Sequence, residues 1–303
     1  MKRTLSFLFV LLMLLVSPTA SIAHQRSKES QQAIDFTFKP YVINNDTINP
    51  YRIKVSCSTH GVALLNNLDT YLSGYNHHGA GYSYTHENFR NAHFGNYNWK
   101  YQTLFSGTIG YADLHDSRQY TLWLNRFWSG YHPFKINSRL QLLAGAQVQL
   151  TAGAFYMPVN GNNPVSVKLR TSLAATGMAI YRIPMRTKEL TARYQLDIPL
   201  IGMAFSPAFG QSYYEIFGLG EYDNTLHLTH PVNSPSWRHT LSLDIPVGKK
   251  HSTTLRVAYV ADIFQSEINK LRTHMYAHSL SLGIVKTLYK VKTGDRLKKH
   301  TPF

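Results

Sequence analysis

RLQLLAGAQVQLTAGA, residues 139–154, alternates between two kinds of side chain with a period of two. The even positions from Leu140 to Ala154 are all apolar, whereas the odd positions are polar or small except for Leu143. A β-strand places successive side chains on opposite faces, whereas a helix would scatter these residues around its circumference. The stretch therefore predicts a strand with one wholly apolar face.

The same alternation recurs along the chain. It is clearest in residues 190–200, 237–247, 253–263 and 276–286, and noisier in 100–112, 119–127 and 165–181. The clear segments have eleven residues or more. They exceed the roughly 5–6 residues of a typical soluble strand and match the about 9–11 residues of a tilted membrane strand.

The polar faces of these segments are rich in Gln, Thr, Ser and Gly, with isolated Arg and Asp. A soluble β-sandwich usually turns a more highly charged face to water, whereas a membrane barrel encloses its polar face. We therefore predict an all-β fold: a single transmembrane, antiparallel, up-and-down barrel of the outer membrane. A secreted β-sandwich is the alternative.

The strand number follows from the segments between residues 79 and 289, which give about ten strands. Residues 52–58 and 69–75 add two more, so we predict about 12 strands, with 10 possible, since bacterial barrels have even numbers. A periplasmic C-terminus then orders the turns. Periplasmic turns are expected at 113–117, 157–164, 204–211 and 248–252, and outer loops at 90–98, 129–138, 182–188, 231–236 and 265–273.

The N-terminus predicts export. Lys2 and Arg3 precede an apolar run from Leu5 to Val16, and small residues follow up to Ala23. This pattern is typical of a cleaved signal peptide, and the apolar run is shorter than the roughly 20 residues of a membrane helix. We expect a signal peptide (1–23), an N-terminal periplasmic segment (24–50), the barrel (51–290) and a basic C-terminal tail (291–303).

The net charge of +15 suggests anionic partners. In an exported protein these are outer-membrane lipids and lipopolysaccharide rather than nucleic acid. The 20 Tyr, 15 Phe and 4 Trp residues fit interfacial girdles. Cys57 is the single cysteine, so an internal disulfide is excluded. We expect Cys57 on the outward side of a strand.

Several stretches resemble a family of uncharacterised outer-membrane proteins from Bacteroides-type bacteria, a domain of unknown function. The resemblance covers roughly residues 62–290 and is carried by LDTYLS (68–73), ENFRNAHF (87–94), NGNNP (160–164) and residues 192–220 and 256–285. It implies an outer-membrane barrel but no activity and no catalytic residues. Typical barrels end in an aromatic residue on the last strand, whereas here residues 290–302 separate the final strand from Phe303.

The most distinctive part of this resemblance is LDIPLIGMAFSPAFGQSYYEIFGLG, residues 196–220. Pro207 and Gly210 predict a turn, after which we expect a return strand from Ser212. Its aromatic residues would form an interfacial belt, and its glutamate would pair with a lumen arginine. The signature residues are Tyr213, Tyr214 and Glu215.

Charged residues on the predicted inner faces form the candidate site. They are Arg139, Lys168, Arg170, Arg193, Asp197, Arg238, Asp244, Arg256 and Asp262. Unpaired charge in a narrow barrel is costly, so we expect a polar network that holds the barrel rigid. The alternative is a lining, biased towards positive charge, that passes or binds small anions.

Other chemistry has weaker support. His115 and Ser117 have the spacing of a serine–histidine pair, but no third residue orients them. His278 lies on an apolar face while Ser279 points into the lumen, and the adjacent His77 and His78 point to opposite faces. No metal or cofactor motif is present. We therefore expect a structural barrel or a narrow channel for small solutes, with an envelope enzyme that modifies lipid or lipopolysaccharide as the alternative.

Overall fold

The alternating segments form long antiparallel strands, since each can turn an apolar face outward and a polar face inward. The computed structural model describes residues 41–43, 46–48, 53–94, 97–186, 188–247 and 253–289. Its elements are β1 (Tyr41–Ile43), β2 (Asp46–Ile48), β3 (Ile53–Asp69), β4 (Ser73–Phe94), β5 (Tyr97–Leu114), β6 (Ser117–Lys135), β7 (Leu140–Tyr156), β8 (Val165–Pro184), β9 (Glu189–Phe205), α2 (Tyr213–Phe217), β10 (Leu226–Thr229), β11 (Trp237–Val247), β12 (Thr253–Ile268) and β13 (Leu271–Tyr289).

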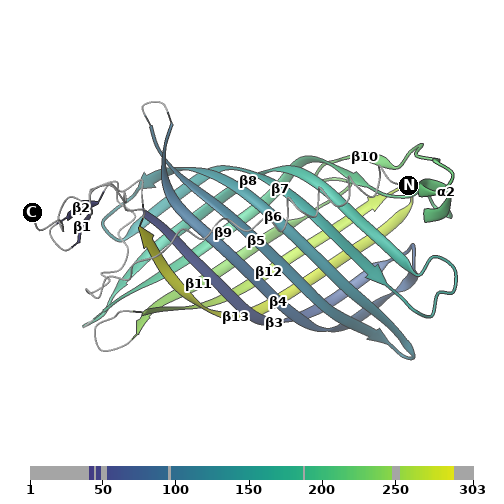
Figure 1. Cartoon of the computed structure of the whole chain (residues 1–303), viewed down its shortest axis with the longest axis horizontal. Coiled ribbons are helices and arrows are strands. Elements are labelled where there is room, and N and C mark those ends of the chain that lie inside the picture. The colour runs from purple at the N-terminus through teal and green to yellow at the C-terminus, as the bar shows by residue number, and fades with distance from the viewer. Residues whose placement is uncertain are drawn as a thin grey trace, which may run out of the picture.

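The main sheet is a closed cylinder. Its last strand, β13, pairs with its first, β3, from Tyr289 opposite Ile53 to Thr273 opposite Asp69. Figure 1 shows the strands tilted against the long axis of the barrel. The eleven-stranded sheet consists of ten strands that close the wall and the short β10. The predicted antiparallel barrel is confirmed. In the part of the chain that the structure describes, ten strands close the wall, the lower of the two predicted numbers.

The wall is interrupted next to β9. Both β10 and β11 pair antiparallel with this strand, β10 opposite residues 202–205 and β11 opposite residues 191–197. Residues 230–236 leave the sheet between them and bond to β12, where the Glu267 amide donates to the Asn233 carbonyl at 2.8 Å. Thus β10 and β11 together act as one broken strand.

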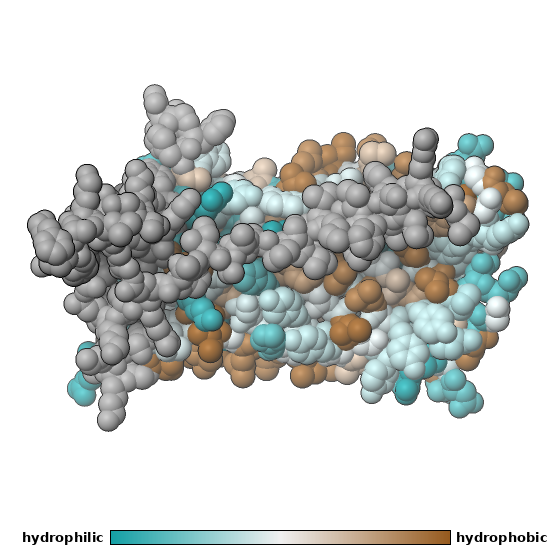
Figure 2. Space-filling view, viewed as in Figure 1, coloured by the Kyte–Doolittle hydropathy of each residue, from teal (hydrophilic) through white to brown (hydrophobic). Residues whose placement is uncertain are grey.

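The two faces of the wall have opposite polarity to those of a soluble protein. Val62 and Leu64 of β3 point outward with 65% of their surface exposed. Buried Gln, Ser, Thr and Arg side chains fill the inside. Figure 2 shows apolar residues over much of the visible wall. An apolar exterior around a polar interior is the arrangement of membrane barrels. None of the described helices is long and apolar enough to cross a bilayer.

Two apolar clusters occupy opposite ends of the interior. One contains Trp123, Phe155, Phe264 and Met275, and the other contains Val55, Cys57, Phe89, Tyr131, Leu143, Met178, Ile180 and Val285. Cys57 is therefore buried inside, so the expectation that it faces outward is wrong. Its side chain packs in the second cluster, near the end of the barrel where β3 begins.

The strand order corrects the predicted arrangement of turns. We call the end where β3 begins and β13 finishes the terminal end, and the opposite one the loop end. No return strand runs from Ser212. The chain therefore crosses the barrel wall one time fewer than predicted between the C-terminus and the turns before residue 206. The turns at 115–116 and 157–164 therefore lie at the loop end, at the same end of the barrel as the turn at 269–270. The prediction that they lie at the opposite end from 269–270 is wrong. The predicted turn 248–252, the signal peptide and the basic tail lie outside the described residues.

Candidate functional site

Glu87 of β4 is at the centre of a charged network in the lumen, next to the terminal-end cluster, since it lies opposite Cys57. Only 4% of its surface is exposed. Its carboxylate accepts hydrogen bonds from Arg193 of β9 at 2.7 and 2.5 Å, and from Arg256 of β12 at 2.5 Å. One buried carboxylate thus bridges two guanidinium groups on β9 and β12, the two strands that flank β11.

Arg256 extends this network to a second acid. Its Nε and Nη2 donate to the two oxygens of Asp244 at 2.6 and 2.7 Å. The paired arrangement is the strong, planar form of an arginine–carboxylate contact. Arg193, Glu87, Arg256 and Asp244 consequently form a chain in which two positive and two negative charges balance.

Neutral polar side chains complete the network. Gln102 of β5 donates to Glu87 at 2.6 Å and to Gln195 at 3.0 Å. The Tyr131 hydroxyl donates to the Gln102 carbonyl at 2.7 Å. Asp197 accepts from Gln195 at 3.0 and 3.1 Å and from the Thr176 hydroxyl. Of these bonds, the one between Gln102 of β5 and Gln195 of β9 crosses the lumen, so it ties together strands that are not neighbours in the sheet.

A second ion pair lies farther towards the loop end. Arg238 of β11 contacts Asp262 of β12 at 3.4 Å and donates to the Ser106 hydroxyl at 2.8 Å. Asn125 also donates to Asp262 at 3.1 Å, and the guanidinium stacks over the Phe127 ring at 5.1 Å. This arginine is again held by an acid, a hydroxyl and an aromatic face.

The third group lies at the loop end beneath residues 206–236. Lys168 pairs with Asp69 at 3.0 Å, whereas Arg170 donates to Ser236 at 3.0 Å and lies over Phe264. Within the described residues Arg170 has no carboxylate in ion-pair range. A cavity of about 20 Å³ borders both bases, which is room for about one water molecule.

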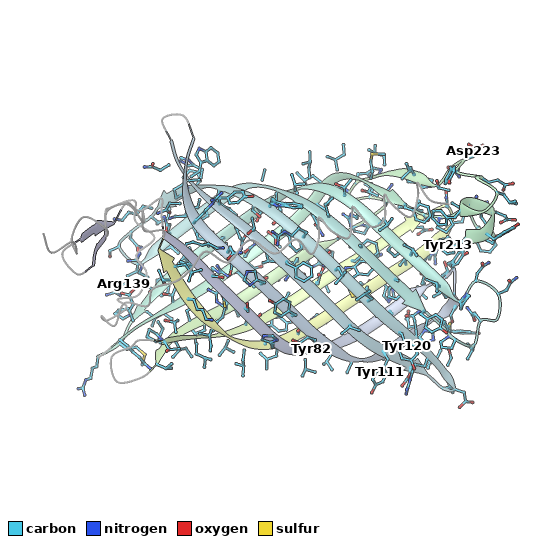
Figure 3. All side chains as sticks on the ribbon, viewed as in Figure 1. Tyr82, Tyr111, Tyr120, Arg139, Tyr213 and Asp223 are labelled. Atoms are coloured by element: carbon cyan, nitrogen blue, oxygen red, sulfur yellow. The ribbon has the colours of Figure 1, made fainter. Side chains whose placement is uncertain are left out.

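The structure brings most of the predicted lumen residues into these three groups, but Arg139 is not among them. It lies exposed in the turn before β7, at the terminal end of the barrel (Figure 3). The alternation that begins at residue 139 starts one position before the strand does. Glu87 was not predicted from the sequence. The predicted set held six basic and three acidic residues, and this excess of positive charge indicated that a further carboxylate was needed.

Residues 206–236 form a cap at the loop end, and the second half of the signature stretch, residues 206–220, belongs to this cap. Ser212 and Glu215 make a capping box: the Glu215 amide donates to the Ser212 hydroxyl at 3.2 Å, and the Ser212 amide donates to the carboxylate at 2.6 Å. These bonds start helix α2, so the predicted strand and the predicted pairing of Glu215 with a lumen arginine are wrong. They also hold the pKa of Glu215 below its ordinary value.

The aromatic residues of α2 anchor the cap to the rim. Tyr213 stacks on Phe217 with ring centroids 6.0 Å apart, and its hydroxyl accepts the Val167 amide at 2.6 Å. Burial raises the pKa of this phenol. The Tyr71 hydroxyl donates to the Gln211 carbonyl at 3.0 Å, whereas Tyr214 is exposed. Figure 3 shows Tyr213 at the end opposite Arg139.

The weaker candidates are not brought together. His115 is exposed in a turn with a positive φ of 51°, and Ser117 contacts His77 instead, at 3.3 Å. His77 is buried and His78 is exposed. His278 lies on the outer wall, where Tyr259 contacts its Nδ1 at 2.8 Å. Among the described residues no cluster of three potential metal ligands occurs.

The sequence as a whole matches the family described as "Protein of unknown function (DUF3316)" over residues 6–295. The chain belongs to this family. The family description assigns no activity, and no curated protein matches the chain.

Solved structures with some similarity are outer-membrane proteins. Ail, the attachment invasion locus protein of Yersinia pestis, is 11% identical with a TM-score of 0.29, covering 77% of this chain and 98% of its own. An outer membrane channel of Pseudomonas putida F1 is 10% identical with a TM-score of 0.36, covering 79% and 96%. The β domain of the Bordetella autotransporter BrkA is 9% identical with a TM-score of 0.37, covering 78% and 99%. Values this low carry no argument about function.

Proposed function

We propose that the protein is an outer-membrane barrel closed to solutes, which holds the cap rigidly at one membrane surface. The filled lumen is the observation that supports this proposal. An apolar cluster occupies each end, and the hydrogen-bonded networks of Glu87 and Arg238 fill lumen space beside them. A barrel of about this size has just enough interior for its own side chains.

We propose that the terminal end faces the periplasm and that the cap lies on the cell surface. Short turns on the periplasmic side and longer loops outside are the rule for bacterial barrels. The longest connection, residues 206–236, lies at the loop end. Phe209, Tyr214 and Val232 are exposed on it, which suits contact with outer-membrane lipids or lipopolysaccharide.

Conductance measurements on the purified protein in planar bilayers test the closed barrel. We expect no steady current in KCl, whereas a porin from the same membranes serves as the positive control. The arginines of the lumen are bonded to acids and hydroxyls, so they offer little free charge to a passing anion. A steady current from the wild-type protein, selective for anions, would favour the channel that the sequence left open.

Cell fractionation tests the location. We expect the protein in the outer membrane, with slower gel migration after boiling, and a mature N-terminus at His24 by mass spectrometry. We also propose, from the resemblance alone, that the protein comes from a Bacteroides-type bacterium. Recovery in the soluble periplasm would overturn the membrane placement.

A further inference from the structure

Three polar side chains meet on the outer wall, where a membrane barrel is expected to be apolar. Ser58 of β3 lies directly opposite His86 of β4, and Asn88 follows on the same face. The Ser58 hydroxyl is 2.8 Å from His86 Nδ1, and the Asn88 amide nitrogen is 3.1 Å from His86 Nε2. A hydroxyl, an imidazole and an amide therefore stand in line.

The line has the order of a nucleophile, a base and a residue that orients the base. The oxygen and nitrogen of an asparagine exchange places by a half-turn of the amide. With its oxygen towards Nε2, Asn88 accepts the ring N–H, so Nδ1 is left to accept the Ser58 hydroxyl proton. This is the role that the third residue has in serine and cysteine hydrolases. The Asn88 Oδ1 has no other partner within the described residues.

The depth of Ser58 suits an ester of a membrane lipid. Val62 and Leu64 lie above it on the apolar part of β3. On the neighbouring strand Ile284, which is 49% exposed, faces Ser58, and the next outward pair is Lys286 opposite Ser56. Ser58 thus lies where the apolar wall ends and charged residues begin, the level at which acyl chains join lipid headgroups.

Positive charges lie on the side of the headgroups. The charges of Lys54 and Arg126 act on the His86 ring, and Arg90 stands on the same face of β4 two residues after Asn88. Arg126 is only 8% exposed, and its Nε has no partner among the described residues. Such guanidinium and ammonium groups are suited to a lipid phosphate.

We propose that Ser58, His86 and Asn88 form an esterase site that removes an acyl chain from a membrane lipid. Ser58 Oγ attacks the ester carbonyl carbon while its proton passes to His86 Nδ1. The Tyr84 hydroxyl, 3.5 Å from Ser58 Oγ, donates to the resulting oxyanion. The ester C–O bond then breaks, and the leaving alkoxide takes the proton from His86.

Water completes the reaction. His86 removes a proton from a water molecule, which attacks the acyl-Ser58 ester, and the serine leaves with that proton. The sum is lipid plus water giving a lyso-lipid plus a fatty acid. Ser58 and His86 are catalytic residues, and Asn88 is a positioning residue. This activity rests on the proposed membrane placement but not on the closed lumen, because the site lies on the other side of the wall.

A fluorophosphonate probe and lipid vesicles test the site on the full-length protein in detergent. We expect one phosphonate adduct, on the peptide that carries Ser58, and release of fatty acid from phosphatidylglycerol vesicles. Ser58→Ala abolishes both, and His86→Ala lowers the rate about 100-fold or more. Ser56→Ala is the matched control, since Ser56 lies on the same face of the same strand and stands opposite Asn88 rather than His86.

The positioning role has its own readout. Asn88→Ala lowers the rate, and Asn88→Asp restores it, because a carboxylate also accepts the ring N–H. Slower migration after boiling shows that each variant still folds. A parallel assay with purified lipid A distinguishes the two lipids that could supply the ester, phospholipid and lipid A. We expect phospholipid to be the better substrate, because the site lies at the terminal end. Absence of any adduct and of fatty acid release in the wild type, or an adduct that persists in Ser58→Ala, overturns the proposal.

Discussion

Glu87 and His86 are adjacent in β4 and face opposite sides of the same wall. Inside, the Glu87 carboxylate is surrounded by donors from β5, β9 and β12. Outside, His86 contacts Ser58 on one side and Asn88 on the other, and Ser58 is partly exposed. A saturated polar group stabilises a fold, whereas an accessible one is free to meet a substrate. On this difference rest our proposals of a structural role for the inner face and a chemical role for the outer one.

The largest effect is expected from breaking the inner network. Glu87→Ala leaves Arg193 and Arg256 buried without their shared carboxylate, and removing one partner of a buried pair costs about 3–5 kcal/mol. Unfolding by urea in detergent, followed by the shift in gel migration, measures the loss. Glu189→Ala is the control, since its contact with Arg182 is long, at 3.9 Å, and partly exposed, where about 0–1 kcal/mol is expected. Equal effects of the two variants contradict a structural role for Glu87.

A smaller effect is expected from adding a side chain to the filled inner face. A Cβ at Gly153 would lie 2.3 Å from the Trp123 ring, whereas one at Gly130 meets nothing within 4 Å. Gly153→Ala therefore overpacks the loop-end cluster, at a cost of about 1–3 kcal/mol in the free energy of unfolding. The same unfolding assay compares it with Gly130→Ala. A lumen with room to spare would tolerate both substitutions alike.

The cap, which we propose lies outside the membrane, is expected to respond locally. Ser212→Ala removes the capping box and weakens α2 by about 1 kcal/mol. Hydrogen exchange of residues 212–217 should rise, while the unfolding of the barrel stays unchanged. Asp223→Ala, an exposed residue of the same cap, is the control (Figure 3).

The cap should also loosen in acid. The pKa of Glu215 is lowered by the Ser212 amide, so ionised Glu215 stabilises α2 above its ordinary pKa of about 4.3. This stabilisation is lost as the pH falls through the lowered pKa, and exchange in α2 should then approach that of Ser212→Ala. Exchange that does not change with pH between neutral and strongly acidic solution argues against the capping box.

The smallest effect on stability is expected at the outer site. Ser58→Ala should change the free energy of unfolding by no more than about 0.5 kcal/mol, as surface substitutions usually do. The same variant abolishes labelling by the probe if the esterase proposal is correct. A loss of stability comparable to that of Glu87→Ala would make the outer trio structural and remove the contrast between the two faces.

Period-two alternation predicted the barrel and the inward direction of Arg193, Arg238 and Arg256, because a strand leaves each side chain only two directions. It failed at Ser212, where S-x-x-E fits a capping box as well as a short alternating strand. One misassigned strand then reversed the side of every earlier turn. The contact of Ser58 with His86 depends on the register of β3 against β4, which spacing within a single segment does not reveal.

The broken strand beside β9 has a mechanical consequence. A cylinder of continuous hydrogen-bond ladders resists opening evenly around its circumference, whereas one with an interrupted ladder yields there first. Between residues 198 and 201, β9 has neither β10 nor β11 across from it, and on its other side the pairing with β8 shifts at Leu173. Heat or lateral tension in the membrane should part the wall along this seam, next to the small cavity at Arg170.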